Sequence, residues 1–266
     1  MSELEFIGYI KGLGEIARIY APFDKQLIAL KEAGIKYPIS VRDTAYIRLN
    51  NGPKEGTRTC HAPLYYQKSP VVLAMKSPLV TDLEMAKQAV DAHRNNKYFF
   101  TEDGSLYEKF HKIAEKDKSK SPEKRRAVIF PIRDTYRLQK GNNISETLFQ
   151  DTEDDYFNEF VKNGLTFYLI NKEIVDSQKG TLVNYLWFDS PDSESDLDGN
   201  GRILNYGSRA FGVSRSRGHA EGVAHEKLKK ISNINLEKKV LGYSKRFVPD
   251  IAKKEFEKGL RKLLNK

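Results

Sequence analysis

Residues 70–94 read PVVLAMKSPLVTDLEMAKQAVDAHR, and they place a strand and a helix in direct succession. The run 70–75 is almost wholly apolar, which is typical of a buried strand. Thr81 stands three residues before Glu84, the spacing of a capping box, and the helix that it opens is expected to reach about Arg94. This stretch therefore predicts a protein that contains both strands and helices.

The rest of the chain mixes the two element types without strict alternation. Apolar and β-branched patterns predict strands at residues 4–10, 37–49, 127–132, 165–170, 181–188 and 239–248. Helical spacing and caps predict helices at residues 23–33, 105–113, 152–162, 219–231 and 249–264.

Three details refine this pattern. Gly34 is expected to end the helix 23–33, and Pro131 places the strand 127–132 toward a sheet edge. The strands at 165–170 and 181–188 are expected to form one hairpin.

The mixture of strands and helices favours an α+β fold, with a mixed or antiparallel sheet and several packed helices, over a doubly wound sheet. The length of the chain allows a single large domain over residues 1–266, or two closely packed subdomains that divide near residues 115–126.

The composition excludes several classes of protein. The 266 residues are 39% hydrophobic, which allows a sizeable core and excludes wholesale disorder. The mean hydropathy is −0.60 and no apolar run approaches 18 residues, so a membrane partner is not expected. The single Cys60 excludes an intramolecular disulfide, and the N-terminal residues lack the pattern of a signal peptide. These features predict a cytoplasmic protein.

The charge is segregated along the chain. The net charge is +9, from 45 Lys and Arg against 36 Asp and Glu. Residues 143–201 carry −10, whereas residues 1–142 carry +8 and residues 202–266 carry +11. A basic tract of this kind predicts an anionic partner, with RNA or DNA as the leading candidate. The acidic segment 146–198 is a candidate surface for a protein partner or for self-association.

Residues 199–218, GNGRILNYGSRAFGVSRSRG, combine glycine, arginine and aromatic residues. Glycine lets backbone N–H groups approach a phosphate, arginine binds phosphate in a bidentate way, and aromatic rings stack on unpaired bases. The alternative is a twisted edge hairpin with solvated arginines. The candidate nucleic-acid-binding residues are Arg202, Tyr206, Arg209, Phe211, Arg215 and Arg217, assisted by Lys124, Arg125 and Arg126.

Residues 196–203, DLDGNGRI, match the first eight positions of an EF-hand calcium loop and resemble that family over these residues only. The twelfth position should be a bidentate Glu and is Gly207 here, so a plain Asp/Gly/Asn turn is favoured. A divalent cation, Mg²⁺ or Ca²⁺, is kept as a candidate cofactor. Its candidate ligands are Asp192, Asp196, Asp198 and Asn200, with Glu194 beside them.

Catalytic chemistry has weaker signals. His219 beside Arg215 and Arg217 is a candidate general acid or base, although a histidine without catalytic duty is the more common case. Cys60 and His61 are adjacent without a partner in sequence, so a free buried thiol is expected. Whether the protein is an enzyme is left open.

The leading hypothesis is a nucleic-acid-binding protein that contacts the phosphate backbone through its basic C-terminal third. Two alternatives stand beside it. One is a metal-dependent nuclease or phosphodiesterase that uses the carboxylates of residues 189–200. The other is a self-assembling structural protein in which the acidic segment of one copy meets the basic segment of the next.

Overall fold

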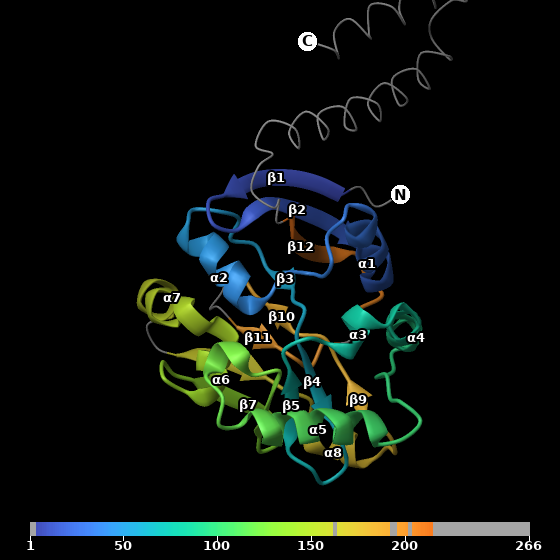
Figure 1. Cartoon of the computed structure of the whole chain (residues 1–266). Helices are drawn as coiled ribbons and strands as arrows, with labels where there is room; N and C mark the ends of the chain where they lie inside the picture. The colour runs from blue at the N-terminus through green and yellow to red at the C-terminus, as the bar shows by residue number, and fades with distance from the viewer. Residues whose placement is uncertain (1–3, 162–163, 192–195, 202–203, 215–266) are drawn as a thin grey trace, which may run out of the picture. The chain divides into compact units, whose positions relative to one another are not determined.

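A long mixed sheet organises the fold (Figure 1). The computed structural model describes residues 4–161, 164–191, 196–201 and 204–214, all within one compact unit that spans Met1–Ser214. In these residues the larger sheet has the strand order β1 (Leu4–Ile10), β2 (Gly14–Ala21), β12 (Ser208–Ser214), β3 (Thr57–Arg58), β10 (Trp187–Phe188), β11 (Leu197–Asp198), β8 (Leu165–Tyr168) and β7 (Thr135–Leu138). Strand β12 runs parallel to β3 and β11 parallel to β8, and the other pairs are antiparallel.

A smaller antiparallel sheet has the order β6 (Ala127–Phe130), β5 (Val71–Ala74), β4 (Ala62–Tyr65) and β9 (Leu182–Val183). All four residues of β5 are 0% exposed. Val71 and Leu73 face one hydrophobic cluster, whereas Val72 and Ala74 face another on the opposite side of the sheet. The strand predicted at residues 70–75 is thus confirmed as buried, and β6 lies at the sheet edge as expected.

Helices cover the sheets (Figure 1). Helices α4 (Leu83–Arg94) and α5 (Ser105–Asp117) pack on one face of the smaller sheet, while α6 (Asn143–Phe149) and α7 (Glu153–Phe160) contribute to the cluster on the other. Helix α1 (Phe23–Glu32) packs on β2 and β12. The other helical segments are α2 (Val41–Leu49), α3 (Pro78–Thr81), α8 (Lys172–Asp176), η1 (Pro122–Lys124) and η2 (Gln150–Thr152). The α+β fold with a mixed sheet is therefore confirmed.

Residues 41–49 form helix α2, so the strand predicted over residues 37–49 is wrong. The Ser40 side chain accepts a hydrogen bond from the Asp43 backbone N–H at 3.0 Å, and this N-cap starts the helix. Arg48 fixes its far end, because its buried guanidinium donates to the Tyr156 hydroxyl at 2.7 Å and lies 4.2 Å from the centre of the Phe188 ring. These tertiary contacts outweigh the strand preference of the β-branched residues.

The hairpin predicted from residues 165–170 and 181–188 is also wrong. Strand β8 lies in the larger sheet, β9 in the smaller one and β10 in the larger sheet again. Helix α8 separates β8 from β9, with the Asn171 side chain accepting from the Glu173 backbone N–H at 2.7 Å. The end of α1 matches expectation, since Gly34 has a φ of +75° after this helix. The capping box predicted at Thr81 is wrong: Asp82 is the N-cap of α4, and its side chain accepts from the Met85 backbone N–H at 3.0 Å. The elements predicted beyond residue 214 lie outside the described residues.

The segment around residues 115–126 connects α5 to β6. Asp117 closes α5 and is 0% exposed, and it accepts from Arg126 Nε at 2.8 Å and from Arg126 Nη2 at 2.9 Å. Lys120 adds an ion pair at 2.7 Å. The hydrogen bonds from Arg126 lower the pKa of Asp117 well below its ordinary value. The bidentate pair thus holds together the two ends of this basic loop.

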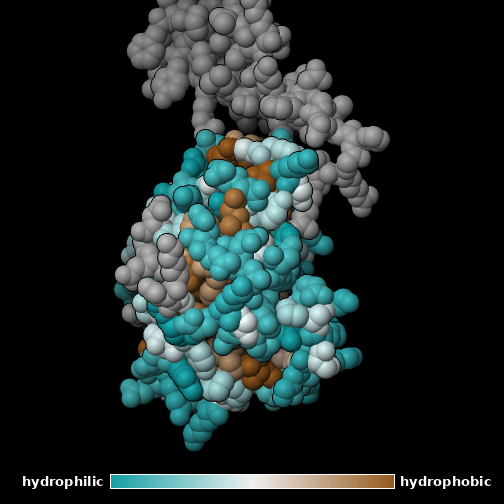
Figure 2. Space-filling view, turned by 90° about the vertical axis from the view of Figure 1, so that its left-hand side faces the viewer, coloured by the Kyte–Doolittle hydropathy of each residue, from teal (hydrophilic) through white to brown (hydrophobic). Residues whose placement is uncertain are grey.

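No helix in the described part of the chain is long and apolar enough to cross a membrane. Figure 2 shows one face of the molecule, on which hydrophilic residues predominate and apolar residues form smaller separate patches.

We expect Asp117→Asn to lower the thermal unfolding midpoint at neutral pH, because the change removes the charge of a buried carboxylate that is bound by Arg126 and Lys120. The folded-state pKa of Asp117 is depressed, so its stabilisation is present above the unfolded pKa of about 3.9 and is lost as the pH falls below it. The difference between wild type and variant should therefore narrow below about pH 4. Thermal melts over this pH range measure it.

The matched control is Asp91→Asn, which breaks the exposed Arg94–Asp91 pair on α4. Exposed pairs contribute little, so the control should leave the midpoint almost unchanged. Equal effects of the two variants would contradict the assignment of a structural role to Asp117.

Candidate nucleic-acid interface

The turn at residues 204–207, which leads into β12, is attached to two helices. The Phe23 backbone N–H at the start of α1 donates to the Leu204 carbonyl oxygen at 3.0 Å. The Leu204 backbone N–H donates to Nδ1 of His93, in the last turn of α4, at 3.3 Å. Both His93 and Leu204 are buried. The beginning of the turn is thus fixed in the core.

A buried arginine holds the rest of the turn. The Arg58 side chain is 0% exposed. Its Nη1 donates to Gln26 Oε1 at 3.0 Å and to the Ala21 carbonyl at 3.2 Å. Its Nη2 donates to the Tyr206 carbonyl at 3.2 Å. Gln26 in turn donates to the Ser208 carbonyl. Burial lowers the pKa of Arg58 to about 10, so the guanidinium stays protonated at neutral pH. A positive charge therefore lies directly beneath the turn.

Two tyrosine side chains near this network are exposed, and Arg209 beside them is partly exposed. Tyr20 and Tyr206 are 63% and 61% exposed, and Arg209 is the cross-strand partner of Tyr20. The Tyr20 ring lies against Gly207, where a Cβ atom would be only 2.6 Å from Tyr20 Cε1. We call Tyr20, Tyr206 and Arg209 the tyrosine patch. It combines two aromatic rings with a cation, as expected of a surface that stacks on bases.

Phe211 lies on β12 but is 1% exposed, in a cluster with Ile16, Ile39 and Ile47. Its ring is therefore part of the core and is not available to stack on a base. Arg18, its cross-strand partner, pairs with Glu5 at 2.8 Å and with another glutamate on the loop before β3. Phe211 and Arg18 therefore do not extend the tyrosine patch, in which two exposed rings lie beside an arginine.

The predicted basic residues at 124–126 differ in role. Arg125 donates to the Asn143 side chain and, at 3.1 Å, to the Thr147 hydroxyl, while Arg126 pairs with Asp117. Lys124 is exposed at the end of η1. Lys124 and Arg126 are both exposed, but the two arginines also form the hydrogen bonds that hold the loop. The predicted residues Arg202, Arg215, Arg217 and His219 lie outside the described residues.

The DLDGNGRI segment forms an Asx-type turn where the structure describes it. Asp198 Oδ1 accepts from the backbone N–H groups of Asn200 at 2.7 Å and Gly201 at 3.1 Å. Burial raises the pKa of Asp198 above its ordinary value. Among the described residues no three His, Cys, Asp or Glu side chains converge on a metal position, and the candidate ligands Asp192 and Glu194 fall outside them. Asp196 and Asn200 flank the turn, and the metal site stays a prediction.

Cys60 and His61 do not form a nucleophile and base. His61 Nδ1 contacts the Met75 carbonyl at 2.8 Å and therefore carries the proton, while Nε2 accepts from the Val41 N–H at 3.1 Å. Burial lowers the pKa of His61 to about 4 and raises that of Cys60 to about 12. The thiol is thus kept protonated, and the histidine is structural.

Two residues of this interface escape sequence reasoning. Tyr20 belongs to a strand, GEIARIYA, whose alternation indicates its face but not that the face is open at this end. Arg58 is an arginine in a two-residue strand, and no local pattern distinguishes it from a surface arginine. Both are revealed only by the tertiary structure.

No protein-family model matches the chain, and the comparisons with curated proteins and with solved structures give no match either.

We expect Arg58→Met to lower the free energy of unfolding by at least about 2 kcal/mol, because it leaves the buried oxygens of Ala21, Gln26 and Tyr206 without their donor. Urea unfolding followed by the fluorescence of Trp187, the single tryptophan, measures the change. Arg94→Met, on the exposed side of α4, is the control and should change stability by less than about 0.5 kcal/mol. A loss of similar size in both variants would contradict a central role for Arg58.

Proposed function

We propose that this protein binds nucleic acid, with the tyrosine patch stacking on unpaired bases and basic side chains contacting the phosphates. The observation that carries the proposal is the exposed Tyr206 side chain on a turn whose backbone is bound from beneath by Arg58. Exposing a large aromatic ring to water costs free energy, and stacking the ring on a base recovers part of that cost. Its neighbours Tyr20 and Arg209 extend the same surface.

The electrostatics agree with an anionic partner. The protonated Arg58 lies beneath the turn, and Arg209 lies beside Tyr20 on its surface. The sequence that follows β12 adds Arg215 and Arg217 in a tract of net charge +11 over residues 202–266. Contacts to phosphates release condensed counterions, so the affinity should fall steeply as the salt concentration rises.

The decisive experiment is fluorescence anisotropy of the full chain with labelled RNA and DNA, single-stranded and duplex, at about 50 and 200 mM salt. We expect Tyr206→Ala and Tyr20→Ala each to weaken binding of single strands by about 1–3 kcal/mol, because each removes a stacked base contact. Duplex binding should change less, since paired bases have no free face. Arg209→Gln should weaken both and lower the salt dependence.

Tyr9→Ala is the matched control. Tyr9 is 55% exposed on β1 and pairs across the strands with Glu15, five residues along β2 from Tyr20. It should leave binding unchanged. The proposal is overturned if no nucleic acid binds at low salt, or if Tyr9→Ala and Tyr206→Ala reduce binding equally.

The two alternatives remain predictions, each with its own test. A metal-dependent nuclease using residues 189–200 would cleave labelled strands with Mg²⁺ or Mn²⁺ and lose the activity with EDTA. A self-assembling protein would sediment as an oligomer that dissociates at high salt, because its contacts would join acidic and basic segments.

A further inference from the structure

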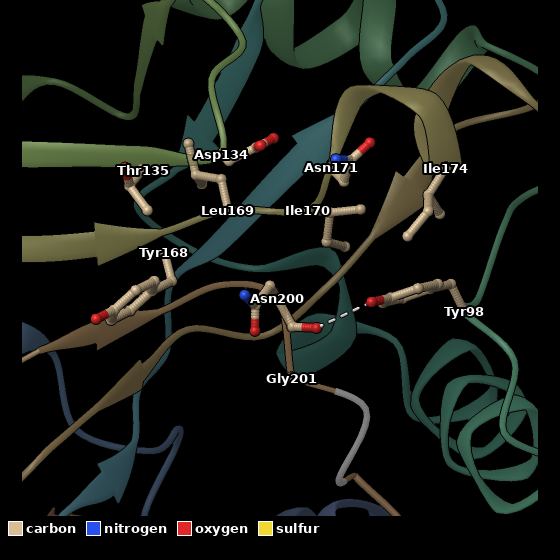
Figure 3. Close-up of a pocket in the computed structure, with 10 residues that line it drawn as sticks. All are labelled: Tyr98, Asp134, Thr135, Tyr168, Leu169, Ile170, Asn171, Ile174, Asn200 and Gly201. Carbon is tan, nitrogen blue, oxygen red and sulfur yellow. Dashed lines mark hydrogen bonds between the residues drawn. The ribbon is translucent and has the colours of Figure 1, made fainter.

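A cavity of about 550 Å³ opens where the parallel strands β8 and β11 end (Figure 3). Because the carboxyl ends of parallel strands meet at one edge of the sheet, the residues that follow both strands line it. Asn171 comes from the segment after β8 and Asn200 from the segment after β11. Asp134, before β7, and Ile174, on α8, complete two of its walls. The cavity is distinct from the tyrosine patch.

Hydrogen bonds from neighbouring side chains hold the backbone of the cavity walls in place. The Asn184 side chain donates to the carbonyls of Gly199 at 2.9 Å and Gly201 at 3.0 Å, and the Tyr98 hydroxyl donates to the Asn200 carbonyl at 3.3 Å (Figure 3). The buried Tyr65 hydroxyl accepts from the Ile170 N–H at 3.2 Å and donates to the Gly199 carbonyl at 3.3 Å. The backbone is thus held in place, as ligand sites require.

The side chains that face the cavity combine flat rings with polar groups. The rings of Tyr98 and Tyr168 lie on either side of Asn200 (Figure 3). In the described part of the chain, no hydrogen bond or ion pair engages the carboxylate of Asp134 or the side-chain amide of Asn200. The Asn171 side chain uses its oxygen to cap α8, which leaves its amide N–H₂ as a donor.

The charge of the residues that line the cavity indicates which ligand it favours. The described lining contains one carboxylate and no Lys or Arg, so a phosphate group is disfavoured inside the cavity. A carboxylate accepts two adjacent donors at once. Among the nucleobases, guanine presents two neighbouring N–H donors on one edge, whereas adenine presents a single donor group beside an acceptor nitrogen. The amide groups of Asn171 and Asn200 can donate to the guanine carbonyl oxygen or accept from ribose hydroxyls.

We propose that this cavity binds the guanine base and ribose of a nucleic-acid strand, with Asp134 accepting hydrogen bonds from the base and the phosphates remaining outside. The choice of a nucleoside rests on the proposed nucleic-acid binding. Gly201 and Tyr206 are five residues apart, which limits their Cα separation to about 18 Å. One strand can therefore reach both the cavity and the tyrosine patch over a few nucleotides.

The test is NMR titration of the full chain with free guanosine, and with adenosine, inosine and ribose as comparison ligands. Guanosine should shift the resonances of residues 168–171 and 199–201 and bind about tenfold or more tightly than adenosine. Asp134→Asn should remove about tenfold of guanosine affinity, whereas Asp154→Asn, on the exposed face of α7, should have no effect. Asp134 is exposed, so its variant is expected to fold.

Several results would overturn the assignment. They are the absence of binding at millimolar guanosine, equal binding of guanosine, adenosine and ribose, and an unchanged affinity in Asp134→Asn. The free nucleoside does not need the tyrosine patch, so Tyr206→Ala should keep guanosine binding while losing affinity for single strands. Failure of the cavity proposal is therefore distinguishable from failure of the proposed function.

Discussion

The guanidinium of Arg58 connects four segments that are far apart in sequence. It extends from β3, bonds to the end of β2 through Ala21, to α1 through Gln26 and to the turn before β12 through Tyr206. Moving this charge into the core costs free energy, which the carbonyl dipoles and the nearby rings of Phe23 and Tyr185 offset. A single buried cation therefore joins β2, β3, α1 and the turn before β12, in addition to the strand pairing within the sheet.

The position of β12 follows from this constraint. Its residues pair with β2 along seven positions, from Ser208 to Ser214. Its pairing with β3 joins Ala210 to Arg58, and the Phe211 backbone N–H also donates to the Thr57 hydroxyl at 3.1 Å. Because Arg58 also holds the preceding turn, β12 enters the sheet in a fixed register, and register decides which side chains face outward. Arg209 consequently stands beside Tyr20 at the open end of the sheet, and Phe211 enters the core. A shift of one residue would turn both side chains to the opposite face of the sheet.

Local sequence predicts most elements and few of the connections between them. The apolar run of β5, the ends of α1 and the edge position of β6 are determined by nearby residues and were predictable. Helix α2 was not, because the contacts of Arg48 with Tyr156 and Phe188 join residues more than 100 positions apart. The same holds for the interface: Tyr206 and Arg209 follow from composition, whereas Tyr20 and Arg58 reach it through strand pairing. The exclusion of Phe211 likewise needs the packed cluster around it.

In the turn at residues 204–207, the backbone contributes to stability, whereas the exposed side chain belongs to the proposed binding surface. The backbone of Tyr206 contributes to folding through its carbonyl, which accepts from Arg58, whereas its side chain is largely in solvent and buries little area. A change at Arg58 therefore acts on the fold, and a change of the Tyr206 side chain acts on the surface alone. Folding has no need of an aromatic residue at that position, since the same carbonyl would be present with any side chain. The proposed nucleic-acid partner would give a tyrosine at this position, next to Tyr20 and Arg209, a role that folding does not require.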